Sequence, residues 1–570
     1  MRTRDRREFL KASGILMAGA TFRSRLSAGV RQAVSDAPKA AVQQSKTQQK
    51  MRGLMVDAGR VPETLDYYRR VIDFCAEWGL NTLHFRLADD QGSALHFASV
   101  PDLVTHKNAF TPDKLNALAV YAQKHGVDVI PELESFGHTG YITRSPKYAH
   151  LLDAAGNSSE FTGVIPVDPE VLRLFDSLYR EVAAIFPSAY LHGGCDEVSW
   201  GGSQQSRRAL QTKTRAQIWA DHLNALNHTA EGLGKRLTVW GDFVLHKEPD
   251  VLEHLNKNVI IMDWNYRETS PTKVGEALTQ IRAKGFRGIG APGLIHYKWG
   301  ARAGTEQLRN IDAYAEAYLT ESDSSSLGVV LTNWVPSRYI QSSIWDGFAY
   351  AAVAFNDGAA TAQSSGLQRF VERHYRAKWN DAWSEVFQLI YENAPHVVER
   401  GPTSGRAAGT ALRLVVPWSS DEQLTAVLND RSPRQNPFPR LRSLLIELEP
   451  QVLDNVSDFK AFALCAEYLE RVYWRENVIL EQAAGKPLDR ETADLLIKGI
   501  AERDQMLAEA LSKDWDVGRF PDSAAKLEPL YGFQPKDQLL FQWEQATKYS
   551  ASLSKSTERF YQRLQAAKLV

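Results

Sequence analysis

The sequence contains few cysteines and no long hydrophobic run. Its three cysteines, Cys75, Cys195 and Cys465, lie far apart among 570 residues. Such scattered cysteines exclude a disulfide framework and a CxxC metal site. The apolar run at Ala12–Ala20 is also well short of the roughly 20 residues that cross a bilayer as a helix. We therefore expect no structural zinc and no permanent membrane anchor.

An excess of charge of either sign is also absent. Lys and Arg total 67 and Asp and Glu total 68, which gives a formal net charge of −1. Without a broad basic surface, neither nucleic acid nor an anionic membrane is an expected partner. A neutral substrate fits this balance better. The sequence does not predict the oligomeric state.

The first 50 residues have the pattern of a targeting signal and not of a folded domain. Arg6-Arg7-Glu8-Phe9-Leu10-Lys11 precede the short apolar run, and small residues follow near Ser27-Ala28. This pattern resembles a twin-arginine export signal. We expect residues 1–50 to be a signal peptide and disordered leader, and the protein to be exported to the periplasm or beyond. An ordinary basic helix is the alternative.

The remaining composition is that of a globular protein. Hydrophobic residues make up 44% and charged residues 24%, which allows large buried cores. The length suits a barrel of about 250 residues plus a second folded unit. Aromatic residues reach 10%, with 14 Trp, and their flat apolar faces serve core packing and sugar binding alike.

Eight strand signals alternate with helical segments between residues 51 and 356, which predicts βα units and a parallel sheet. Eight is the count of a closed (β/α)8 TIM barrel, and no GxGxxG or Walker-type loop follows the first strand as an open nucleotide-binding sheet would favour. We predict an α/β fold with a catalytic barrel over 51–360 and an α-helical C-terminal domain over 361–570. The predicted strands are Arg52–Ala58, Thr82–Ala88, Val127–Leu133, Ala189–Gly194, Leu237–Asp242, Val259–Trp264, Gly288–Leu294 and Gly328–Trp334. The predicted C-terminal helices are Leu367–Tyr391, Phe459–Gln482, Glu491–Leu511 and Lys536–Leu569.

Polar residues gather at the predicted carboxyl ends of the early strands, where a parallel barrel places its active site. The fourth strand ends in His192-Gly193-Gly194-Cys195-Asp196-Glu197. Two adjacent carboxylates oppose each other's ionisation, so their placement there is costly without compensating groups. The later strands end in aromatic residues instead. Acids facing aromatic rings indicate a carbohydrate pocket.

These residues closely resemble the family-20 glycoside hydrolases, the β-N-acetylhexosaminidases. Four motifs occur in the family's order over some 150 residues, so chance is a poor explanation. They are Arg52-Gly53 with Asp57 and Arg60, Asp90-Gln91-Gly92, Pro131-Glu132 through Gly137-His138, and His192 through Glu197.

The resemblance implies exo-acting, retaining hydrolysis of terminal N-acetyl-β-hexosaminides by substrate-assisted catalysis. Glu197 would protonate the leaving oxygen, which calls for a raised carboxyl pKa, and would later activate water. Asp196 would accept a hydrogen bond from the substrate's acetamide N–H and balance charge on an oxazolinium-like intermediate.

The same resemblance suggests roles for further residues. Arg52 and Asp90 would hold ring hydroxyls. Trp240, Trp264 and Trp334 would wall the acetamide pocket, with Tyr297 donating to the acetamide oxygen. The remaining candidates, which would orient the acids and tune their pKa, are His138, which we also place in the substrate-binding set, His192 and Glu134.

Three departures leave the outer hydroxyls, and the preference between gluco and galacto substrates, open. Ser93, Trp299 and Pro336 stand where the family commonly has Trp, Asp and Glu. Two alternatives remain: a glycosidase of other specificity with two separated carboxylates, and a non-catalytic carbohydrate-binding barrel. We expect no cofactor and no metal, because no His, Asp or Glu set shows ligand spacing in the sequence.

Overall fold

The computed structural model describes residues 49–153, 163–295, 302–320, 324–399, 437–484 and 490–528, and scattered positions from 531 to 562. The predicted export signal and most of the leader lie outside these residues. Lys50–Val570 form one compact unit. In the part of the chain that the structure describes, no helix is both long and apolar enough to span a bilayer.

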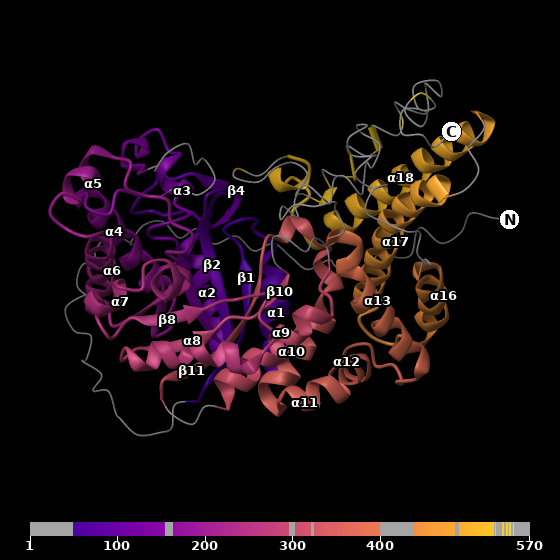
Figure 1. Cartoon of the computed structure of the whole chain (residues 1–570), viewed down its shortest axis with the longest axis horizontal. Helices are drawn as coiled ribbons and strands as arrows, with labels where there is room; N and C mark the ends of the chain where they lie inside the picture. Colours follow the sequence, from indigo (N-terminus) through magenta and orange to yellow (C-terminus); the bar gives the residue numbers. More distant parts are fainter. Residues whose placement is uncertain are drawn as a thin grey trace, which may run out of the picture. The chain divides into compact units, whose positions relative to one another are not determined.

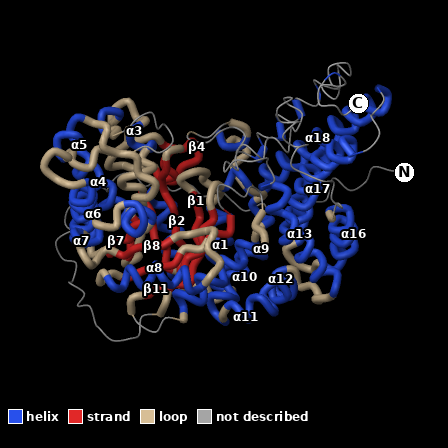
Figure 2. Tube along the Cα trace, viewed as in Figure 1, coloured by secondary structure: helices blue, strands red, loops and turns tan. Residues whose placement is uncertain are grey.

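Eight parallel strands close into a barrel, as predicted (Figures 1 and 2). The first strand pairs with the second through Gly53 and Thr82 and with the last through Met51 and Gly328, which closes the sheet. All eight predicted strands are present. They are β1 (Met51–Asp57), β2 (Thr82–Asp89), β5 (Asp128–Leu133), β6 (Tyr190–His192), β7 (Arg236–Trp240), β8 (Ile260–Asp263), β9 (Arg287–Gly290) and β11 (Ser326–Asn333).

Helices cover the outside of the barrel and begin and end at recognisable signals. Thr64 caps α1 (Leu65–Glu77) by accepting from Tyr67 N, and Gly79, at φ 74°, turns the chain out of that helix. A capping box of Thr214 and Gln217 begins α6 (Arg215–Gly232) and satisfies two backbone N–H groups reciprocally. The other long helices around the barrel are α2 (Pro112–Lys124), α4 (Pro169–Ile185), α8 (Pro271–Ala283), α9 (Thr305–Tyr314) and α10 (Trp345–Asp357).

Short elements at the carboxyl ends of the strands were not predicted. After Asp90 the chain turns back in β3 (Gly92–Leu95), antiparallel to β2, and β4 (Thr105–Phe110) pairs with β3. The predicted seventh strand also divides, because a short β10 (Gly293–Ile295) pairs separately with β11. β3 and β4 build the rim beside β2, and β10 extends it beside β11.

The C-terminal part is helical, as predicted, with one correction. The predicted helix Leu367–Tyr391 is two helices, α12 (Leu367–His374) and α13 (Asp381–Glu399). The chain leaves α12 because Arg376 adopts a φ of 53° and the carbonyl of Tyr375 accepts from the backbone of Leu453 instead. Helices α16 (Phe438–Leu448), α17 (Val456–Ala484) and α18 (Arg490–Gly518) pack nearby. Most of the predicted helix Lys536–Leu569 lies outside the described residues.

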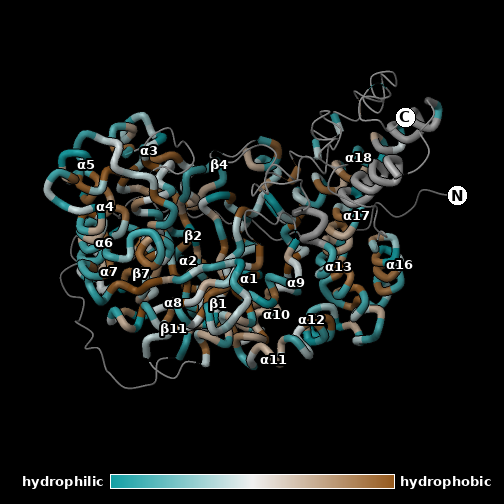
Figure 3. The backbone as a smooth tube through the Cα atoms, in the orientation of Figure 1, coloured by the Kyte–Doolittle hydropathy of each residue, from teal (hydrophilic) through white to brown (hydrophobic). Residues whose placement is uncertain are grey.

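The helical part joins the rim of the barrel through a buried ion pair. Arg519, directly after α18, bonds to Glu63 at 2.9 Å and also donates to the carbonyls of Pro336 and Tyr339. Glu63 accepts a further hydrogen bond from Gln341. Hydrophobic residues form a continuous core between the strands and the surrounding helices (brown in Figure 3), and this core continues into the C-terminal helices.

Candidate active site

The two adjacent acids stand on a backbone that is held in an unusual conformation. Asp196 and Glu197 follow β6, and both Cys195 (φ 74°) and Glu197 (φ 45°) have left-handed backbone angles. Left-handed angles strain the backbone of non-glycine residues. Residues strained in this way cluster at functional sites. A β-carbon on Gly137 would collide with the carbonyl of Asp196. The sequence after β5 is therefore shaped to let this loop approach closely.

His138 links the two acids to a third carboxylate. Its Nε2 lies 3.4 Å from Glu197 Oε2 and 3.8 Å from Asp196 Oδ2. Its Nδ1 lies 3.1 Å from Asp90 Oδ2. The imidazole is buried, whereas the Glu197 side chain is 33% exposed. A proton can thus pass between His138 and an acid that solvent or a ligand reaches.

Burial and neighbouring charges set the protonation of this group. Burial alone would lower the pKa of His138, yet the carboxylates of Asp196 and Asp89 hold that pKa well above its usual range. Burial raises the pKa of Asp196, with His138 opposing. For Glu197, burial raises the pKa, but the hydrogen bond and charge of His138 outweigh it and the net pKa is lowered.

The lowered pKa of Glu197 differs from the prediction, because a raised pKa was expected for a general acid. The unliganded site leaves Glu197 ionised beside a protonated His138. The proton needed for acid catalysis is present, but it resides on the imidazole. A ligand that displaces water and further buries Glu197 would favour the move of that proton to the carboxylate.

Arg86 compensates the negative charge below the acids. This fully buried guanidinium lies 2.6 Å from Glu134 Oε1 and 3.1 Å from Glu132 Oε1, and it also pairs with Asp89. Glu134 in turn accepts a hydrogen bond from Cys195 N at 3.0 Å. A buried carboxylate without a partner would be very costly. The Arg86 network therefore allows several acids at one end of the barrel.

The predicted tryptophans lie in one aromatic group. The ring centroids of Trp240 and Trp334 are 5.7 Å apart, and Trp334 Nε1 donates to Tyr266 Oη at 2.8 Å. Trp264, which is partly exposed, stacks on Tyr266 with centroids 5.1 Å apart. The group borders the acids, because their charges contribute to the raised pKa of Tyr266, for which burial is the largest cause. Tyr297 lies outside the described residues.

The structure corrects the role predicted for Arg52. It lies at the amino end of β1, opposite the end that carries the acids, and its Nε donates to the carbonyl of Phe355 at 2.8 Å. Arg60, three residues past β1, lies at the acid end. It pairs with Asp57 at 3.1 Å and Asp89 at 3.2 Å, and its guanidinium is 5.1 Å from the ring of Trp334.

Asp90 is also placed differently from the prediction. Both of its carboxylate oxygens are engaged inside the protein, one with His138 and the other with Gly140 N at 2.9 Å. With 2% of its surface exposed, Asp90 acts as a support for His138 rather than as a partner for ring hydroxyls. His138 likewise positions the acids.

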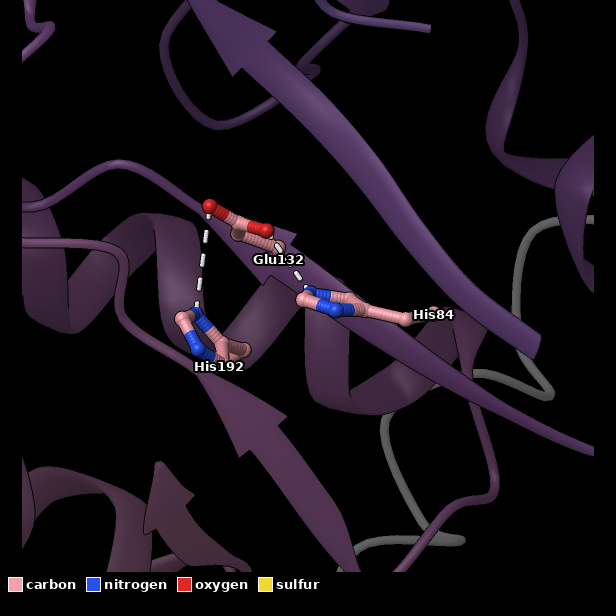
Figure 4. Close-up of side chains that lie close together, drawn as sticks. All are labelled: His84, Glu132 and His192. Atoms are coloured by element: carbon pink, nitrogen blue, oxygen red, sulfur yellow. Dashed lines mark ion pairs between the residues drawn. The ribbon is translucent and has the colours of Figure 1, made fainter. Parts of the chain in front are cut away.

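His192 and Glu134 contact the backbone of the loop that leads from β6 to the acids. His192 forms a cluster with His84 and Glu132 in the barrel interior (Figure 4). Burial lowers the pKa of His192 to about 3, so this imidazole is neutral and its Nδ1 accepts from Gly194 N at 3.0 Å. Trp240 Nε1 donates to Glu132 at 3.0 Å. The cluster thus contacts Trp240 through Glu132 and the backbone that leads to Asp196 and Glu197 through His192.

Among the described residues, three sets of His and carboxylate side chains come close enough together to hold a metal, which the sequence spacing did not reveal. They are His84 with Glu132 and His192, Asp89 with Asp90 and His138, and His138 with Asp196 and Glu197. In the first set, His84 Nε2 is 2.7 Å from Glu132 Oε2. Ligands about 2.0–2.1 Å from a tetrahedral zinc stand more than 3 Å from one another. The 2.7 Å contact is therefore a direct contact of the two side chains that leaves too little room for zinc, and the adjacent Arg86 charge also disfavours a cation.

Sequence reasoning gave no role to several residues at the site. Asp242, just past β7, accepts from Glu197 N at 3.3 Å, and burial with the charge of Asp196 raises its pKa to about 7. Val335, at φ 56°, donates its N–H to Asp57 and so fixes the chain beside Trp334. Asp242 ends a predicted strand, and Val335 and Tyr266 follow predicted strands, so their position at the acid end was the available signal. Arg86 lies inside a predicted strand and gave no comparable signal.

Comparison with known proteins supports the same region of the chain. Residues 50–326 match the model of the glycosyl hydrolase family 20 catalytic domain. A beta-hexosaminidase of Vibrio furnissii is 27% identical over 251 residues, which cover 38% of this chain and 40% of that protein. A beta-hexosaminidase of Akkermansia muciniphila is 30% identical over 189 residues, covering 29% of this chain and 38% of that protein. The chain thus spans less than half the length of these relatives.

Solved structures give matches of lower identity. The chitobiase of Flavobacterium johnsoniae aligns over 88% of this chain and 78% of its own, with 17% identity and a TM-score of 0.47. The order of the four motifs, the meeting of Arg60, Asp90, His138, Asp196 and Glu197 at one end of the barrel and the match over residues 50–326 agree. Residues 50–326 therefore match the catalytic domain of glycosyl hydrolase family 20.

Proposed function

We propose that the protein is an exo-acting β-N-acetylhexosaminidase that hydrolyses terminal N-acetyl-β-hexosaminides with retention, using the substrate's acetamide as the nucleophile. One observation carries this proposal: Asp196 and Glu197 share a single histidine nitrogen, at 3.8 and 3.4 Å. The two relatives named above, both described as beta-hexosaminidases, support the substrate class.

The shared histidine argues against the usual pair of opposed carboxylates. Oxygens of Asp196 and Glu197 lie within 4.8 Å of each other, on the same imidazole edge. An inverting pair is separated by roughly 6.5–9.5 Å to leave room for water, whereas a retaining pair is about 5–5.5 Å apart, so the short separation favours retention. Asp196 and Glu197 lie on one imidazole edge, which suits the roles of electrostatic partner and proton donor, and the acetamide then supplies the nucleophile.

Glu197 and Asp196 act at different steps of the proposed reaction. Glu197, the more exposed acid, receives the His138 proton as the substrate excludes water, and it donates that proton to the leaving oxygen. Asp196 accepts a hydrogen bond from the acetamide N–H and stabilises positive charge on the cyclised intermediate. Arg60, beside Trp334, replaces Arg52 as the cation that faces the sugar. Asp90 and Asp242 position His138 and the Glu197 backbone.

The test compares two isosteric variants on three substrates. An aryl N-acetyl-β-glucosaminide should be cleaved and the matching plain β-glucoside should not. Glu197→Gln should lose turnover of substrates with poor leaving groups while keeping the first step on activated aryl glycosides. Asp196→Asn should lower kcat on both kinds of N-acetyl substrate by about 100-fold or more, because the intermediate loses its partner. Equal kcat for wild type and Asp196→Asn would defeat the mechanism, and cleavage of the plain glucoside would favour the other glycosidase class.

A further inference from the structure

A cationic pocket opens beside the active site, between the barrel rim and the C-terminal part of the chain. Its volume is about 180 Å³, which is room for several waters or a small polar group. The barrel side is formed by Arg60, Gln91, His106, Lys107, Asn108 and Arg144, and the opposite side by residues 523–525 and Tyr531. Because Arg60 also faces Trp334, the pocket continues the sugar site rather than lying apart from it.

The charge in this pocket is unbalanced at one residue. Arg60 is paired with Asp57 and Asp89, and Lys107 is paired with Asp522 at 2.8 Å. Among the described residues, no carboxylate lies within ion-pair distance of Arg144. Burial lowers the pKa of His106, so that imidazole is neutral and brings no compensating or additional charge. The excess charge in the pocket is therefore the guanidinium of Arg144.

Arg144 is held in place so that part of its guanidinium remains available. Its Nη1 donates to the carbonyls of Asp90 at 2.9 Å and Gln91 at 3.2 Å, and the group lies 4.0 Å from the ring centroid of Tyr531. Guanidinium carries five N–H donors in a fixed plane. Two are used by these carbonyls, and the others suit the oxygens of an anion in the bidentate manner typical of arginine. Gln91 Nε2 donates to Tyr531 O at 2.6 Å and closes the pocket wall.

We infer that this pocket is a subsite for an anionic group on the glycan, a sulfate ester or a carboxylate, held by Arg144 with Arg60 and Lys107 behind it. The inference rests on the proposed function and names its substrate class. It also gives the C-terminal part of the chain a role, because residues 523–525 and Tyr531 form the pocket's second wall. The protein as a whole carries almost no net charge, so selectivity for an anion must come from this local placement.

The decisive variant adds a charge without removing a contact. Ala524 is exposed and lines the pocket, and its β-carbon can carry a longer side chain. Ala524→Glu introduces a carboxylate that repels an anionic ligand, and Ala524→Gln is the matched neutral variant of nearly equal size. Arg144→Gln is a second probe, although it also removes the two carbonyl contacts. The measured quantity is the ratio of anionic to neutral ligand, so general damage to the site cancels.

Binding is measured on the full chain by calorimetry, with N-acetylglucosamine and its 3-, 4- and 6-O-sulfates, and with a disaccharide in which N-acetylglucosamine is linked to a uronate. We expect at least one anionic ligand to bind wild type about fivefold tighter than its neutral counterpart, as one screened charge pair allows. That preference should vanish in Ala524→Glu and persist in Ala524→Gln. The sulfate and uronate arms distinguish the two sources of the anion.

The outcomes separate this inference from the proposed function. If no anionic ligand binds wild type better than its neutral counterpart, or if Ala524→Glu and Ala524→Gln give the same ratio, the subsite is wrong. Turnover of the neutral aryl N-acetylglucosaminide is followed in parallel. Hydrolysis of that substrate without an anion preference overturns the subsite alone, whereas an anion preference without hydrolysis of any N-acetyl substrate overturns the proposed function alone.

Discussion

The two ends of the barrel differ in which residues have left-handed backbone angles. At the amino end, left-handed angles fall on glycines, such as Gly79 after α1 and Gly285 after α8, at φ 74° and 80°. At the carboxyl end some fall on glycines, such as Gly194, but others fall on residues with side chains: His138, Cys195, Glu197 and Val335. Glycine adopts these angles without strain. The amino end is therefore built for stability, and the carboxyl end accepts strain in order to aim its side chains.

The two arginines of the first predicted motif give the largest expected contrast. Arg60→Gln removes a cation beside Trp334 and the acids, so kcat/KM should fall roughly 100-fold, as loss of one or two charge-assisted hydrogen bonds would give. Arg52→Gln removes a hydrogen bond to Phe355 O at the amino end, so kcat/KM should stay within about twofold while stability falls by about 1 kcal/mol. Steady-state kinetics and urea unfolding measure the two effects. A larger loss of activity in Arg52→Gln would reverse the assignment.

Two aspartates with raised pKa values, the buried Asp242 and the partly buried Asp128, give a contrast in pH dependence between the two ends. The folded pKa of Asp242, raised to about 7 by burial and by Asp196, exceeds its unfolded value near 4. The unfolded state therefore loses its proton first, and Asp242 costs stability progressively as pH rises from about 4 to 7. Asp242→Asn should be more stable than wild type by roughly 1–3 kcal/mol at pH 8 and no different at pH 3.

The matched variant is Asp128→Asn at the amino end, where burial also raises the carboxyl pKa against Ser188 and Lys235. It should alter stability in the same direction but leave the pH profile of kcat/KM unchanged, whereas Asp242→Asn should remove an inflection near pH 7 from that profile. Denaturation and kinetics across pH 3–9 provide both readouts. Identical activity profiles for the two variants would mean that Asp242 does not act on Glu197.

The smallest contrast concerns the strained backbone itself. In Val335→Gly, relief of strain of order 1 kcal/mol offsets only part of the roughly 1.5–3 kcal/mol lost with the buried valine, so stability should fall by about 1–2 kcal/mol. Catalysis should also fall a few-fold, because the chain beside Trp334 becomes mobile. Gly79→Ala should instead cost about 1 kcal/mol of stability with activity intact. Thermal unfolding and kcat on the neutral aryl substrate separate strain that serves catalysis from strain that does not.

Much of the barrel could be predicted from the sequence, because its strands are short apolar runs and its helices end at glycines such as Gly126. The loop that carries Asp196 and Glu197 could also be recognised in the sequence, because the two acids are adjacent. The role predicted for Arg52 was wrong for a physical reason. A motif gives the order of residues along the chain, but the direction of the strand decides at which end of the barrel each residue lies. Arg60, just past the strand, satisfied that rule.

Other features depend on contacts that no local pattern encodes. Arg86 acquires its role only when the registers of β1, β2 and β5 bring four carboxylates around it. The contact between Gln91 and Tyr531 joins residues 440 positions apart. The protonation of Glu197 depends on the summed effect of burial and His138, and those two influences oppose each other. Such properties arise only in the folded chain.

The buried pair of Arg519 and Glu63 has a consequence for any attempt to shorten the protein. A chain that stops soon after residue 360 would keep Glu63 at the barrel rim without its cation, and would leave the carbonyls of Pro336 and Tyr339 without their donor. The seam between the first and last strands would then loosen where Trp334 stands. The helices beyond the barrel thus contribute contacts that stabilise the barrel rim, and we expect a chain shortened in this way to unfold more readily.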